Sequence, residues 1–400
     1  MIQIKMFKAN EGDAILVSFG ENSDINIMID MGPRSTYEEY IKPVLKDLKL
    51  NGKKLDLLVI THIDEDHIFG ALEFMKENGI ERRVIDVGEV WHNAYRHLQF
   101  DKEKVVKLSD KEKEKVDEII VSNTPASDNK DGSIDISVNQ GISLGGYLLK
   151  DNYNWNGYFN NNAVKCEEGI KEIDFMKGIK IILLSPNKDK LNKLSKIWLK
   201  ELKDNYNLKN ISDEEFWDDA YEYYMQYLKG DDCEASDIAY SKVTEKNIKK
   251  WALIEESDSS KPNGATISFI IEYKGDKLLF LGDAHENIIY ESLKTLKDDC
   301  YELDFKVVKL AHHGSNKNIS RRLIELINTR KYLISTDGIR HDHPDMEAIS
   351  KILTKSTKKE KELIFNYEID KIKSLIDSNL QNEFNYSVCF LNENDYITIN

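Results

Sequence analysis

Short apolar runs alternate with amphipathic segments in the N-terminal part of the chain. Residues 14–19, 25–29 and 55–60 are apolar enough to predict buried strands. Residues 37–48 and 68–77 carry apolar positions at helical spacing, which predicts a helix in each segment. Strands that alternate with helices are typical of an α/β fold.

The same pattern returns in the second half of the chain. Apolar runs at 179–184, 277–281, 305–310 and 332–335 predict four more strands. Between the first two of these runs, residues 189–202 have apolar positions at helical spacing and predict a long helix. The chain therefore has enough predicted strands for more than one sheet.

A further helix is expected to begin at Ser212, where Glu215 completes a capping-box pattern. Aromatic residues, among them Phe216 and Trp217, lie along this segment. We expect them either to pack as helix core or to form a face that binds a protein partner or lines the substrate entrance.

Composition narrows the class of protein. The chain has 400 residues, 40% of them hydrophobic, which is sufficient for a large core. A formal net charge of −15 argues against broad electrostatic attraction to nucleic acid, although a local basic groove remains compatible with it. The sequence begins without the apolar core of a signal peptide, and no apolar run approaches the roughly 18 residues of a membrane span. We therefore expect a cytoplasmic protein without membrane contact.

The cysteines do not indicate a metal site or a disulfide framework. They are far apart and form no CxxC pair; they are Cys166, Cys233, Cys300 and Cys389. Candidate chemistry is therefore carried by other residues.

Histidines and acids gather at the ends of predicted strands. Thr61-His62-Ile63-Asp64-Glu65-Asp66-His67 follows the run at 55–60, and Gly282-Asp283-Ala284-His285 follows the run at 277–281. Two later runs lead into Ala311-His312-His313-Gly314 and His341-Asp342-His343. No histidine occurs between residues 98 and 284, which indicates that the histidines belong to sites.

These residue types suit water activation by two metal ions. Neutral imidazoles and carboxylates bind Zn²⁺ or Mn²⁺, and two neighbouring ions can share a hydroxide that attacks an electrophile. We therefore expect two divalent metal ions, zinc or manganese, as cofactors.

In their order, the motifs resemble the metallo-β-lactamase-fold metallohydrolases, and among them the branch that includes the hydrolase domain of the competence protein ComEC. The segment from His62 to His67 matches the family's HxHxDH motif, with an acid at the second ligand position. Residues 11–16 and 29–32 match the branch's opening pair of strands. After the first motif, four stretches follow in the branch's order, at residues 263–271, 281–283, 312–315 and 343–344. The resemblance covers about residues 1–90 and 260–355.

The resemblance implies a four-layer αββα sandwich with helical insertions. All 400 residues would then form a single domain. Residues 93–178 and 185–260 are the expected insertions, and residues 361–400 would complete the fold.

The resemblance also implies a ligand set. His62 and Asp64 would bind one ion, Asp66 and His67 the other, and Asp283 would bridge them. His313 is expected to be the remaining ligand of the second ion, with His312 as the alternative. The family's third motif has a histidine where this chain has Asn263, so this departure leaves the filling of the first ion's site open.

Other residues near these motifs are assigned secondary roles. Asp66, His312 and His343 are the residues expected to take part in catalysis, and a near-neutral pKa would let His343 bind a phosphate oxygen or protonate the leaving group. Asp30 resembles an acid that orients a ligand imidazole. His285 is expected at the surface. His92 and His97 are not expected to replace the third-motif histidine that the chain lacks.

The function implied by the ComEC-like branch is hydrolysis of phosphodiester bonds, as a nuclease or phosphodiesterase. Two alternatives remain open. The same ions could serve the hydrolysis of a lactone, thioester or lactam. The chain could also be a binding or sensing subunit of a multi-protein system, possibly one of defence, in which little catalysis remains and a helical insertion contacts the partner.

Overall fold

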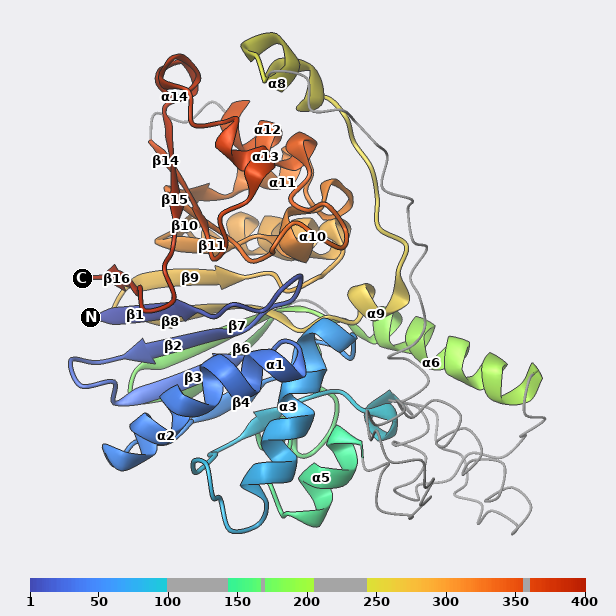
Figure 1. Ribbon diagram of the computed structural model, residues 1–400. Helices are drawn as coiled ribbons and strands as arrows, with labels where there is room; N and C mark the ends of the chain where they lie inside the picture. Colours follow the sequence, from blue (N-terminus) through green and yellow to red (C-terminus); the bar gives the residue numbers. More distant parts are fainter. Residues whose placement is uncertain (99–142, 167–169, 205–242, 355–359) are drawn as a thin grey trace, which may run out of the picture.

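The computed structural model describes residues 1–98, 143–166, 170–204, 243–354 and 360–400. These residues form two large sheets packed face to face, with helices on both outer surfaces (Figure 1). The predicted four-layer α/β sandwich is therefore confirmed. The helix predicted from Ser212, the greater part of the segment 93–142 and Cys233 lie outside the described residues.

The first sheet has six strands, and its outer strand comes from the C-terminus of the chain. Its order is β16 (Ile397–Ile399), β1 (Ile2–Met6), β2 (Ile15–Phe19), β3 (Ile25–Ile29), β4 (Leu57–Val59) and β5 (Val90–Trp91). The pairs β16–β1, β1–β2 and β2–β3 are antiparallel, whereas β3, β4 and β5 run parallel to one another. The two termini consequently lie side by side (Figure 1).

The second sheet has eight strands and is parallel over its C-terminal half. Its order is β15 (Tyr386–Phe390), β14 (Lys361–Phe365), β13 (Lys331–Ile334), β11 (Val307–Lys309), β9 (Asp276–Phe280), β8 (Ser268–Tyr273), β7 (Ile179–Ser185) and β6 (Lys171–Met176). Strands β9 to β15 run parallel to one another, and β6 to β9 are antiparallel.

Alternation along the strands explains the layers. In β2, Ile15, Val17 and Phe19 face the second sheet, while Leu16 faces the outer helices. A strand whose two faces are both covered reads as a continuous apolar run, as this one does. The core between the sheets thus joins the two halves of the sequence.

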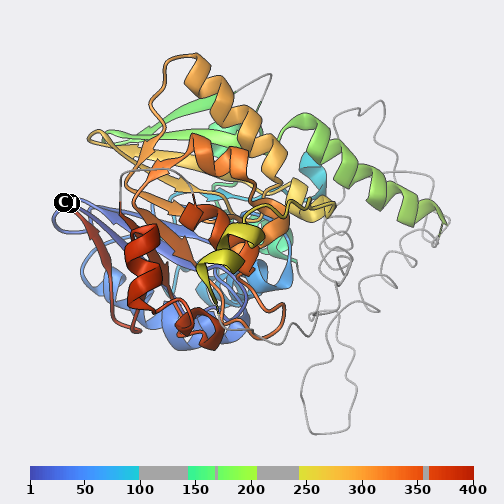
Figure 2. The same ribbon diagram turned by 90° about the horizontal axis from the view of Figure 1, so that it is seen from above.

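Helices cover the two outer faces. The first sheet is covered by η1 (Tyr37–Ile41), α2 (Lys42–Leu50), α3 (Glu65–Asn78) and α5 (Leu144–Lys150). The second is covered by α10 (Glu286–Asp298), α11 (Arg321–Leu326), α12 (Met346–Thr354), α13 (Asp370–Lys373) and α14 (Ser378–Phe384). Three further short helices are α1 (Arg34–Thr36), α8 (Glu245–Trp251) and α9 (Lys261–Gly264). The predicted helix at 189–202 is α6 (Lys188–Asp204), which projects from the sandwich (Figures 1 and 2).

Two of the differences in bounds between predicted and observed elements affect the description of the site. The strand expected at 305–310 is divided, because Phe305 belongs to β10 (Asp304–Phe305), which pairs with β12 (Asn328–Thr329), and β11 begins at Val307. The helix expected from Ile68 begins at Glu65, so Asp66 lies in its first turn. Acids in the first turn are favoured by the helix dipole. Part of the first motif is therefore helical.

No helix in the described ranges is both long and apolar enough to cross a membrane. Cys166, Cys300 and Cys389 are free thiols.

Candidate metal centre

The histidine and acid motifs meet at one edge of the sandwich. The loops that follow β4, β9 and β11 bring His62, Asp283 and His313 together there, because these strands all point their C-terminal ends to this edge. Glycine permits the close approach. Gly282 has φ +49°, and a Cβ at this position would lie 2.5 Å from Cγ2 of Thr266.

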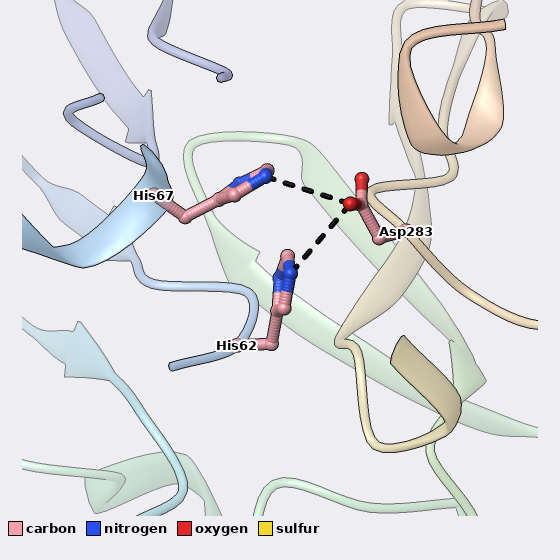
Figure 3. A group of neighbouring side chains, drawn as sticks. All are labelled: His62, His67 and Asp283. Atoms are coloured by element: carbon pink, nitrogen blue, oxygen red, sulfur yellow. Dashed lines mark ion pairs between the residues drawn. The ribbon is translucent and has the colours of Figure 1, made fainter. Parts of the chain in front are cut away.

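One carboxylate oxygen is the centre of the cluster. Oδ2 of Asp283 lies 3.7 Å from Nε2 of His62 and 3.6 Å from Nε2 of His67 (Figure 3). The same oxygen is 3.6 Å from Nε2 of His313 and 3.8 Å from Nε2 of His312. Hydrogen bonds are shorter than this, whereas two ligands of one tetrahedral ion with bonds near 2.0–2.1 Å are separated by roughly 3.4 Å. The spacing fits shared cations.

On the first sheet, each imidazole is oriented through its other nitrogen. Nδ1 of His67 donates to Oδ2 of Asp30 at 2.9 Å. The hydroxyl of Thr61 donates to the same carboxylate at 2.7 Å, so its oxygen accepts from Nδ1 of His62 at 3.0 Å. Both rings thereby present Nε2 to Asp283, as metal-binding histidines do. The predicted orienting contact of Asp30 is present.

The histidine pair after β11 follows the same pattern. Nδ1 of His313 donates to the backbone carbonyl of Ser335 at 2.8 Å, and Nδ1 of His312 donates to Oδ1 of Asn318 at 2.9 Å. The Asn318 amide is itself fixed, because its Nδ2 donates to Asp258 and to the backbone carbonyl of Asp283. Both imidazoles therefore direct Nε2 towards the shared carboxylate.

Buried polar atoms without partners support a metal at this position. Nε2 of His62, His67 and His313 and Oδ1 of Asp283 are buried and have no hydrogen-bond partner in the part of the chain that the structure describes. Unsatisfied buried polar groups are costly, and a cation would satisfy all of them. The donor set of imidazoles and carboxylates fits Zn²⁺ or Mn²⁺.

Two further acids divide the cluster into two sides. Oδ2 of Asp66 lies 3.5 Å from Nε2 of His67 and 3.5 Å from Nε2 of His313. Oδ2 of Asp64 lies 3.5 Å from Nε2 of His62. The structure thus brings together all the predicted ligands, with Asp283 between the two sides.

The carboxylates of the cluster raise the pKa values of its buried imidazoles. Burial disfavours the imidazolium of His313, but the carboxylates of Asp283, Asp66 and Asp13 outweigh it and raise its pKa to about 10. Burial likewise opposes the charge of His67, yet Asp66, Asp283 and Asp30 hold its pKa well above the ordinary value. Protons therefore occupy these imidazoles at neutral pH when no metal is bound, and a metal has to displace them.

Asn263, which stands at the third-motif position, is not aimed at Asp283. Its amide donates to Oδ2 of Asp258 at 2.7 Å and lies 3.5 Å from Nδ1 of His312. Asp258 in turn lies 3.8 Å from Nδ1 of His312. Asn263, at the position of the absent histidine, and Asp258 thus both lie beside the imidazole of His312.

A buried ion pair beneath His313 was not predicted from the sequence. Nζ of Lys309 lies 2.6 Å from Oδ2 of Asp13, and both side chains are almost fully buried. Oδ1 of Asp13 lies 3.6 Å from Nδ1 of His313. The signal was a lysine within the apolar run at 305–310. Asp258 and Asn318 gave no comparable signal, since they lie in polar loops.

The remaining histidines have other surroundings. His343 lies beside Asp345, and its ring is 5.4 Å from that of His312. Burial lowers the pKa of His343 to about 4, so the near-neutral pKa expected for it is wrong. His285 is buried rather than at the surface, because its Nε2 donates to the backbone carbonyl of Ser260. Both His92 and His97 pack against the ring of Trp155.

Comparison with known proteins agrees with this arrangement in the N-terminal part of the chain. Residues 10–140 match the family model of the metallo-beta-lactamase superfamily. No curated protein sequence matches the chain.

The solved structures that the chain matches include two of distant sequence. The metallo-beta-lactamase fold protein YhfI from Bacillus subtilis is 7% identical, with a TM-score of 0.39 and full coverage of both chains. CmlA from Streptomyces venezuelae, a diiron beta-hydroxylase, is 11% identical, with a TM-score of 0.38 and 99% of this chain covered. The chain spans about half the length of CmlA, 54%.

Proposed function

We propose that the protein is a dinuclear metal-dependent hydrolase whose substrates are phosphodiesters. The observation that carries this proposal is the convergence of four imidazole Nε2 atoms on one carboxylate oxygen of Asp283. Two divalent ions bound there would supply Lewis acidity and a nucleophilic hydroxide at neutral pH. The motif order that resembles the ComEC-like branch favours phosphodiester bonds over other substrates.

The two sides of the cluster suggest how the ligands are divided. One ion would be held by His62, Asp64, Asp283 and His312, and the other by Asp66, His67, His313 and Asp283. The assignment of His312 to the first ion replaces its expected catalytic role. It rests on the orientation of the ring, since Nδ1 is held by Asn318 and Nε2 lies 3.8 Å from Asp283. His312 would then supply the imidazole that the third motif lacks.

The residues around the ligands hold the imidazoles in place. Asp30 and the Ser335 carbonyl fix two rings, and the Lys309–Asp13 pair supports one of them. His343 is neutral at pH 7 because of its lowered pKa, and a neighbouring dication would lower that pKa further. It therefore suits a hydrogen bond with substrate better than protonation of the leaving group.

The substrate class is tested with metal-loaded protein and a panel of candidates. Mn²⁺- and Zn²⁺-loaded samples are incubated with bis(p-nitrophenyl) phosphate, single-stranded and double-stranded oligonucleotides, and lactones. Hydrolysis of the phosphodiesters, lost in Asp66→Ala, is the expected result. Cleavage of lactones alone would replace the phosphodiester proposal with the alternative hydrolase. A biological effect that survives Asp66→Ala would point to the binding subunit instead.

A further inference from the structure

A cavity of about 400 Å³ lies next to the metal centre and is separate from it. Its walls are the start of α6, the loop before α9 and the start of α10. The carboxylate of Asp258 forms the partition. Its Oδ1 lies 3.9 Å from Nε2 of His285, which lines the cavity, and its Oδ2 lies 3.8 Å from Nδ1 of His312 in the metal centre. One layer of side chains separates the two spaces.

Cationic side chains predominate around the cavity, although the chain as a whole carries a net charge of −15. Five cationic side chains and three carboxylates line it. The cations are Lys190, Lys193, Lys261, Lys317 and Arg322, and the carboxylates are those of Glu256, Asp258 and Glu286.

Two of these carboxylates already have partners. Glu286 forms a bidentate ion pair with Arg322, with contacts of 2.9 and 2.7 Å. Asp258 accepts from Asn263 and Asn318, and it faces His312. With Arg322 and Glu286 paired to each other, four lysines line the wall against two carboxylates, Glu256 and Asp258, so cations remain in excess there.

Lys190 and His285 contact each other in the wall of the cavity. Nε2 of His285 donates to the Ser260 carbonyl at 2.6 Å, so its Nδ1 accepts from Nζ of Lys190 at 2.7 Å. Asn287 accepts a second, longer bond from Lys190 at 3.3 Å. An ammonium has three N–H donors, and within the described ranges the third has no acceptor, so it can donate to a ligand. Lys190 is thus held in place by a neutral imidazole rather than by an acid.

The start of α10 also lines the cavity, through Glu286 and Asn287. Glu286 is an acid in the first turn of this helix, and its carboxylate is paired with Arg322. The volume is also within the range of sites for small molecules, roughly 300–1,000 Å³.

We propose that this cavity binds a second phosphate of the substrate, next to the one that is hydrolysed, so that the preferred substrate is a nucleotide chain rather than an isolated phosphodiester. This inference rests on the proposed function, because it places the scissile phosphodiester at the metal centre. It reconciles an acidic protein with a polyanionic substrate, since attraction is confined to one basic cavity beside the reacting bond.

Matched dinucleotides test the inference through activity. The dinucleoside monophosphate TpT is compared with pTpT and TpTp, which each add one terminal phosphate. We expect kcat/KM for one phosphorylated form to exceed that for TpT by about tenfold, as a charge-assisted contact would give. In the variant with both Lys190→Gln and Lys193→Gln, this ratio falls towards one. Lys294→Gln removes a lysine of α10 that does not line the cavity, and it leaves the ratio unchanged.

A binding measurement judges the inference without hydrolysis. Metal-free protein is titrated with inorganic phosphate by calorimetry, and we expect the affinity to fall about tenfold in the double lysine variant and to persist in Lys294→Gln. If no phosphodiester is cleaved but this difference is found, the proposed function fails and the phosphate site stands. Equal phosphate affinity in the wild-type protein and the double variant, or equal kcat/KM for TpT and both phosphorylated forms, would overturn the inference.

Discussion

The two sides of the candidate metal centre differ in how firmly their proposed ligands are held. On the side of Asp66, His67 and His313, both imidazoles are essentially buried, and their Nδ1 atoms donate to a carboxylate and a backbone carbonyl. On the side of His62, Asp64 and His312, the orienting partners are a hydroxyl and an amide. The side chains of Asp64 and His312 are 34% and 24% exposed. Charged and backbone partners orient a ligand more firmly, so we expect one tightly and one weakly held ion.

The largest expected effect is the loss of both ions when the shared ligand is removed. Asp283→Asn keeps the volume of the side chain but removes the negative charge that faces four imidazoles. We expect elemental analysis to find neither ion after dialysis, and hydrolysis to become undetectable. Circular dichroism serves as the control for folding. Retention of two ions per chain in this variant would remove the basis for a shared centre.

Single-ligand variants should separate the two sides. His312→Ala is expected to keep the tightly held ion and to lose the other, which gives about one metal per chain. His67→Ala, its counterpart on the buried side, should abolish the tight phase of a metal titration. The comparison fails if the two variants lose the same ion, or if His312→Ala still binds two.

Metal affinity should rise with pH. The pKa of His313 is raised to about 10 and that of His67 lies well above its ordinary value, so metal-free protein carries protons on both rings at pH 7. Binding displaces these protons, and fewer need to be displaced as the pH increases from 6 towards 10. Calorimetry in buffers of different ionisation enthalpy counts the protons released. We expect His313→Gln to release fewer protons, whereas an affinity independent of pH would contradict the assigned protonation.

Smaller effects are expected from the residues that orient the ligands. Asp30→Asn should weaken the tight ion by about 10–100-fold through His67, and the weak ion to a smaller extent, because Asp30 also holds the Thr61 hydroxyl that orients His62. Asn318→Ala should act on the weak ion, towards the lower end of that range. Metal titration followed by competition with a chelator measures both changes. A shift of the tight ion in Asn318→Ala would show that the two sides are not independent.

The sequence predicted much of the sandwich because most of its strands are apolar runs with buried surroundings. The runs at 25–29 and 277–281 correspond closely to β3 and β9. The bounds of the strands were harder to predict where tertiary contacts decide them. Phe305 leaves its neighbours to pair with Thr329 in a separate small sheet, which no local pattern indicates.

Within the candidate site, ligand types could be predicted but their surroundings could not. His62 and His67 stand in a dense motif, whereas the contact of His312 with Asn318 and Asp258 depends on loops that approach only in the folded chain. The surface position expected for His285 is wrong for the same reason, because α6 and the 256–264 loop cover it. Periodicity describes what an element buries and not which loop covers its end.

Anomalous scattering from crystals grown with Mn²⁺ or Zn²⁺ tests the central claim most directly. Difference maps calculated at the absorption edge of the metal should contain two peaks on either side of the Asp283 carboxylate. The stronger peak is expected beside Asp66, His67 and His313, and the weaker beside His62, Asp64 and His312. Maps without a peak at Asp283, or with a single ion that leaves either group of imidazoles without contact, would contradict the dinuclear centre.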